Sequence, residues 1–147
     1  MSKTAIIIII GILIISIASF MAWGNQSNKS EITKRDYIRF PQDENGDILY
    51  GFYLKGIKLD MISKVDFAVI FPNEKNAIQF DNVCKSLGLS TNLSNYDSVP
   101  GYTFQVIASK SMIPSHANIS EWETKLGEIA KKFGGRNDGW GFMTKKQ

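Results

Sequence analysis

The most prominent feature of the hydrophobic pattern is a nearly unbroken apolar run near the N-terminus, over residues 4–23. A run of about 20 apolar residues is long enough to cross a bilayer as a helix, whose backbone groups must hydrogen bond within the segment. The run ends at Trp23, and tryptophan is enriched at membrane interfaces. The pattern therefore predicts a single transmembrane helix over residues 4–23, in contact with the lipid bilayer.

Two questions about this segment stay open. A signal peptide cleaved before Asn25 would place Ala22 and Gly24 at the usual small-residue positions, but the run is long for a signal peptide, which favours a retained anchor. The basic residues that follow the run favour a domain on the cytoplasmic side. A short N-terminal tail acting as a signal anchor would instead place the domain outside.

Beyond a polar linker over residues 24–42, short periodic segments predict one folded domain over residues 43–147. Residues 65–71 and 102–109 alternate with the period of a strand, and apolar side chains recur at helical spacing over 77–87 and 119–133. Residues 89–93 and 138–143 are shorter strand candidates. The segment 43–58 fits either a helix or a strand, and Asp43 or Asn45 as a cap and Gly56 as a stop favour the helix.

The order strand, helix, strand, strand, helix, strand is that of the ferredoxin-like α+β fold, with both helices on one sheet face. The helix over 43–58 precedes it and is expected to cover Ile70 and Ile107 on the other face. The expected core between sheet and helices consists of Phe67, Phe80, Phe104, Trp122, Ile129 and Phe133.

Composition excludes several classes of function. The net charge is +3, from 17 basic and 14 acidic residues, and no dense basic patch points to nucleic acid. One cysteine and one histidine cannot supply a zinc site. Cys84 fits a buried helix position, and His116 has no nucleophile near it in the sequence. The acidic run Asp43–Asp47 lacks the twelfth-position carboxylate of a calcium loop, where Leu54 stands.

No set of residues in the sequence forms a catalytic, metal-binding or cofactor-binding motif, so the chain is predicted not to be an enzyme and not to take a small-molecule substrate. The most distinctive string is Asp138–Gly141, DGWG. Physical reasoning favours a packing role, with Trp140 in the core beside Trp122. The alternative places Asp138 or Trp140 at a partner surface.

Four strings together resemble one known family. They are GDILYGFYLKG at 46–56, FPNEKNA at 71–77, SMIPSHANISEWE at 111–123 and GGRNDGWG at 134–141. The chain resembles the family of the regulator of ribonuclease E activity B, and the last string, its closing signature, is the most specific part of the likeness.

The resemblance implies a ferredoxin-like fold and a non-catalytic, protein-binding regulator. Its partner would be the endoribonuclease ribonuclease E, whose activity it would reduce and so modulate RNA turnover. The resemblance, with the apolar run, implies a single-pass protein of a bacterial inner membrane. A tethered immunity-type or envelope domain with an unknown protein partner is the alternative. The candidate partner surface consists of signature residues: Arg136, Asp138, Gly139, Trp140 and Gly141.

Overall fold

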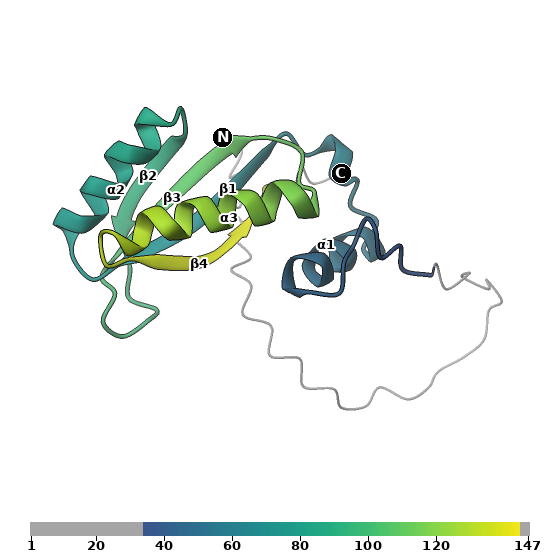
Figure 1. The fold of residues 1–147 in the computed structure, drawn as a ribbon, viewed down its shortest axis with the longest axis horizontal. Coiled ribbons are helices and arrows are strands. Elements are labelled where there is room, and N and C mark those ends of the chain that lie inside the picture. The colour runs from purple at the N-terminus through teal and green to yellow at the C-terminus, as the bar shows by residue number, and fades with distance from the viewer. Residues whose placement is uncertain (1–33, 145–147) are drawn as a thin grey trace, which may run out of the picture.

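The computed structural model describes residues 34–144, which form one sheet, two helices packed on it and a further helix at one end (Figure 1). A short 3₁₀ helix, Leu59–Met61, precedes the first strand. The bounds are α1 Glu44–Leu54, β1 Lys64–Phe71, α2 Glu74–Ser86, β2 Ser90–Asn95, β3 Phe104–Ser111, α3 His116–Lys131 and β4 Arg136–Gly141. The predicted combination of helices with an antiparallel sheet is confirmed.

The four strands are antiparallel to their neighbours and lie in the order β2-β3-β1-β4. The two central strands pair along their whole length, from Lys64 with Ser111 to Phe71 with Phe104. The chain therefore runs through two interleaved βαβ units, each with a strand of the other unit between its own two strands. This is the split βαβ connectivity that the order of segments in the sequence predicts.

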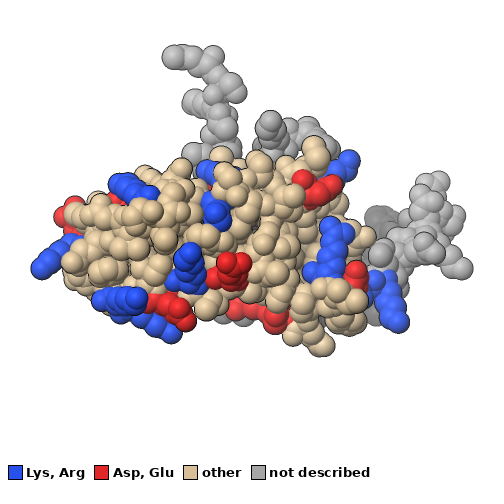
Figure 2. Space-filling view, turned by 45° about the horizontal axis from the view of Figure 1, so that its top comes forward, with Lys and Arg blue, Asp and Glu red and all other residues tan. Residues whose placement is uncertain are grey.

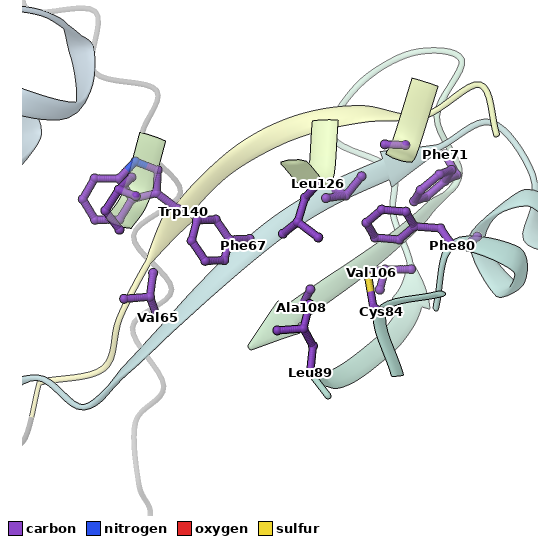
Figure 3. Close-up of a cluster of buried hydrophobic side chains, with 14 of the residues drawn as sticks. Val65, Phe67, Phe71, Phe80, Cys84, Leu89, Val106, Ala108, Leu126 and Trp140 are labelled. Carbon is purple, nitrogen blue, oxygen red and sulfur yellow. The ribbon is translucent and has the colours of Figure 1, made fainter. Parts of the chain in front are cut away.

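The core lies between the sheet and the two helices that cover one of its faces (Figure 3). Val65, Phe67, Val69 and Phe71 alternate along β1, and all are at most 2% exposed. The ring of Phe71 lies 5.0 Å from that of Phe80 on α2, centroid to centroid. Burial of such apolar side chains is the main source of stability in a domain of this size.

Local capping contacts set the helix ends. The Asn73 side chain accepts a hydrogen bond from the Asn76 amide, 3.0 Å away, at the start of α2. Ser115 caps α3 in the same way through the Asn118 amide at 3.2 Å. Gly88 ends α2 with a φ of +77°, a conformation that costs glycine little.

The first helix does not lie where the sequence suggested. Asp43 caps α1 through the Gly46 amide at 2.8 Å, so the helix itself is confirmed. However, α1 packs beside α3, with Leu49 in the same core as the β1 side chains, and does not cover the opposite face of the sheet. Its sequence shows which side is apolar but not which neighbour that side meets.

The predicted core is correct only in part. Phe67 and Phe80 are fully buried, whereas Phe104, Trp122, Ile129 and Phe133 are partly buried and pack at its margin. The ammonium groups of Lys110 and Lys125 lie 4.4 and 4.6 Å from the Trp122 ring centroid, so lysine side chains cover the indole. Phe40, ahead of α1, belongs to the core at 2% exposure and was missed.

The transmembrane helix predicted over residues 4–23 lies outside the described residues, as does most of the linker. Within residues 34–144, no helix is both long and apolar enough to cross a membrane.

Truncation of the buried ring on α2 tests this core. We expect Phe80→Ala to lower the free energy of unfolding by about 3–5 kcal/mol, because a large buried ring leaves a cavity. Ile78→Ala, on the exposed side of the same helix, should change it by less than about 0.5 kcal/mol. Urea denaturation of both variants measures the difference, and equal losses would contradict the assigned helix face.

Candidate partner-binding surface at the closing signature

The closing signature lies on β4, an edge strand that pairs with β1. The register shifts between Ala68 and Val69, which pair with Gly139 and Asn137, so Asp138 is an extra residue in a β-bulge. The strand begins at Arg136, two residues earlier than the sequence predicts. The bulge places Asp138 and Trp140 in different environments.

Two glycines of the signature are needed for backbone geometry. A side-chain carbon at Gly135 would overlap the ring of Phe71, and Gly139 has a φ of +114°, which other residues rarely adopt. Close approach and the bulge therefore explain these glycines without reference to a partner.

Trp140 points to the helix side of the sheet and is 8% exposed. Its ring centroid lies 6.4 Å from that of Phe52 on α1 and 6.3 Å from that of Phe142. The indole Nε1 donates a hydrogen bond of 2.7 Å to Asn45 Oδ1. The packing role predicted for Trp140 is thus supported, and its ring contacts come from Phe52 on α1 and from Phe142.

Asn45 connects Trp140 to α3 through its amide group. Asn45 Nδ2 donates to Glu123 Oε2 at 2.6 Å and to the Ser120 hydroxyl at 3.3 Å. Nearby, the Asn137 side chain donates to the Glu123 carbonyl oxygen at 2.8 Å. One polar network therefore joins α1, α3 and β4.

The other side of the signature faces the sheet surface that no described helix covers. Here the Tyr96 hydroxyl donates to Asp138 Oδ2 at 2.7 Å, and the Arg136 guanidinium lies 5.0 Å from the Tyr102 ring centroid. Both tyrosines flank the turn between β2 and β3. Ile70 on the same face is fully buried, so this end of the open face is closed over by its own side chains.

Burial raises the pKa of the Tyr96 hydroxyl, and the adjacent Asp138 carboxylate raises it further. The hydroxyl therefore stays protonated and donates to Asp138. This bond holds the turn between β2 and β3 against β4. We call Tyr96, Tyr102, Arg136 and Asp138 the signature face.

The histidine and the cysteine are held within the structure. His116 Nε2 lies 2.7 Å from Asp43 Oδ2 and joins the starts of α3 and α1. Burial raises the pKa of the Cys84 thiol to about 12, which makes it unreactive at neutral pH. No three His, Cys, Asp or Glu residues come together as metal ligands within residues 34–144.

A hollow of about 450 Å³ lies beside the signature between α3 and β4, lined by polar side chains that include Glu123, Lys131 and Arg136. Sites for small molecules are usually enclosed and largely apolar. This hollow is open to solvent and lined by polar side chains, and so differs from such a site.

The structure thus divides the five candidate residues. Arg136 and Asp138 lie on the signature face, Trp140 lies in the core, and Gly139 and Gly141 pair with β1. Tyr96, Tyr102 and Asn45 were missed as partners of the signature. Their contacts join segments far apart in the sequence, and no local pattern indicates them.

Comparison with known families gives one match, over residues 42–142, to the family described as "Regulator of ribonuclease activity B" (RraB). The match runs from the residue before the α1 cap to the residue after β4. The chain belongs to this family. No curated protein matches the chain. The family is described as a regulator of an enzyme, so a protein partner such as a ribonuclease is implied.

The polar network makes stability depend on pH at Glu123. Burial raises the pKa of this carboxyl above 4.5, against the opposing hydrogen bond from Asn45. A carboxyl whose pKa is higher in the folded than in the unfolded state contributes stability below its unfolded-state pKa. This contribution is lost as the pH rises through its folded-state pKa. The ionised form therefore costs stability at neutral pH.

Glu123→Gln removes the ionisation but keeps an oxygen that accepts from Asn45. We expect the variant to have a free energy of unfolding at neutral pH equal to or higher than that of the native chain. Its free energy of unfolding should also fall less than that of the native chain as the pH rises from about 4.5. Urea denaturation across this range measures both, with Glu121→Gln on the exposed side of α3 as the control. A marked loss of stability at neutral pH, with an unchanged pH profile, would contradict this account.

Proposed function

We propose that this chain is a membrane-tethered, non-catalytic regulator that binds ribonuclease E and lowers its activity, and so slows RNA turnover. The observation that carries the proposal is the family match over residues 42–142, which spans every helix and strand of the described domain. The family description supplies the class of target, a ribonuclease. The particular enzyme and the direction of the effect rest on the resemblance of the four sequence strings.

The charge distribution supports a protein partner in preference to direct RNA binding. Figure 2 shows Lys and Arg interspersed with Asp and Glu over the visible face, without a broad basic area. A protein that binds RNA by itself usually carries a dense basic patch or stripe.

We place the contact with the partner at the signature face. Tyrosine and arginine are enriched among the residues that dominate binding energy at protein interfaces. Arg136 stacks on Tyr102, and Tyr96 is held by Asp138, so these side chains are ordered before binding. Ordering in advance lowers the entropy lost when a partner binds.

The apolar run over residues 4–23 supports tethering to the inner membrane, and a ribonuclease partner requires the domain on the cytoplasmic side. A domain on the outer side would leave only an envelope partner.

The test is a binding and cleavage assay with the full chain, solubilised in a mild detergent and tagged at its C-terminus. Purified ribonuclease E should be retained, and its cleavage of an RNA substrate should slow in proportion to the chain added. Arg136→Ala and Asp138→Asn should weaken binding by about tenfold or more, as for central interface residues. Lys75→Ala, an exposed position on α2, is the matched control and should bind as the native chain does.

Circular dichroism melting of each variant separates loss of contact from loss of fold. No retention by the native chain, together with unchanged cleavage, would refute the ribonuclease proposal. Retention of the enzyme by Arg136→Ala and Asp138→Asn at native strength would place the contact elsewhere on the domain.

A further inference from the structure

Exposed apolar side chains gather in the segment that begins the described domain. Ile38 is 95% exposed, Met61 74% and Leu54 61%. Tyr37 and Tyr53 of the same segment are also exposed. Residues 34–61 form the end of the molecule away from α2 (Figure 1).

Basic side chains accompany them. The Arg39 guanidinium lies 5.4 Å from the Tyr53 ring centroid and 5.0 Å from that of Phe40. Arg39, Tyr53 and Lys58 line one open groove of about 350 Å³, with Asp60 as its acidic member. Lys55, the C-cap of α1, is exposed and is followed in the sequence by Gly56, which also lines the groove.

The exposure of Ile38 is built into the fold. The Asp36 carboxylate accepts from the backbone amides of Ile38 and Arg39, at 2.9 and 3.2 Å, and so fixes the turn that carries them. Phe40 is buried in the core immediately afterwards. The turn is therefore held in place, and it presents Ile38 to the outside.

Arg35 secures the start of this segment. Its Nε donates to the Phe40 carbonyl oxygen at 2.8 Å, a second guanidinium nitrogen donates to the Pro41 carbonyl oxygen, and a third pairs with Asp47 at 2.6 Å. Asp36 and Asp47 are thus both engaged within the domain. Arg39, Lys55 and Lys58 are exposed to the surroundings.

The position of this surface in the chain indicates what it meets. Ten residues separate Trp23, the end of the apolar run, from Lys34. Fully extended, they reach no more than about 35 Å. A tethered domain therefore stays within about one domain diameter of the bilayer, on the end where residues 34–61 lie.

We infer that this end of the domain, defined by Ile38, Leu54, Met61, Arg39, Lys55 and Lys58, rests on the lipid surface and sets the orientation of the domain. Apolar side chains enter the boundary between head groups and acyl chains, and lysine and arginine pair with lipid phosphates. Tyr37 and Tyr53 suit the same depth. The inference rests on the tether proposed above but does not depend on which protein the signature face binds.

The test is fluorescence quenching on the full chain in vesicles of phosphatidylethanolamine and phosphatidylglycerol. Ile38→Cys and Met61→Cys are labelled with a small environment-sensitive fluorophore, and Ile78→Cys on α2 is the matched control. All three side chains are exposed, so labelling should not disturb the fold. The native Cys84 is buried, and the native chain therefore serves as the unlabelled blank.

Lipids with a nitroxide on the head group supply the quencher. We expect most of the fluorescence to be lost at positions 38 and 61 and little at position 78. Carbonate extraction of the same vesicles shows whether the chain is anchored.

A chain that is extracted by carbonate overturns both the tether and this inference. A chain that stays anchored, with equal quenching at the three positions, overturns the lipid contact alone. Spectral changes at position 38 that follow protein concentration, with no quenching by the lipid nitroxide, would mean that a second copy covers this surface, and would also overturn it. None of these outcomes bears on ribonuclease binding, which the earlier assay measures in detergent.

Discussion

The arrangement of the domain depends on one partly buried hydrogen bond, from the Trp140 indole to Asn45. A large indole can fill the space between β4 and α1 only if its N–H finds a partner, because a buried donor without one costs about 1–3 kcal/mol. Asn45 supplies the acceptor, and its own amide nitrogen donates hydrogen bonds to Glu123 and Ser120 on α3. The bond therefore fixes α1 relative to the sheet, and with α1 the whole segment 34–61.

This constraint explains why one short signature serves two purposes. On the helix side, the Trp140 ring fills space in the core. Gly135 has no side chain and so leaves room for the ring of Phe71. On the open side, the bulge at Asp138 frees a carboxylate that the Tyr96 hydroxyl then engages. We therefore expect changes at Trp140 to act through folding, and changes at the exposed Arg136 to test the proposed recognition. The two proposed contacts, with a partner and with lipid, then occupy separate parts of one domain.

Much of the fold can be predicted from the sequence because the signals are local. Alternation along residues 65–71, the caps at Asn73 and Ser115 and the stop at Gly88 each depend on neighbouring residues only. What could not be predicted depends on pairing between distant segments. The place of α1, the bulge in β4 and the contact between Tyr96 and Asp138 all require the strand register. Phe40 closely follows Tyr37 and Ile38, which are exposed, and the local sequence does not indicate which of the three is buried.

The central claim is that Trp140 and Asn45 stabilise the domain as a pair, and a double-mutant cycle measures this directly. Trp140→Phe removes the donor and keeps an aromatic ring, and Asn45→Ala removes the acceptor. Urea denaturation of the native chain, both single variants and the double variant gives the coupling free energy. The account predicts a coupling of about 1–2 kcal/mol, with the double variant less destabilised than the sum of the singles. Additivity within about 0.3 kcal/mol would show that the two residues act independently and would contradict it.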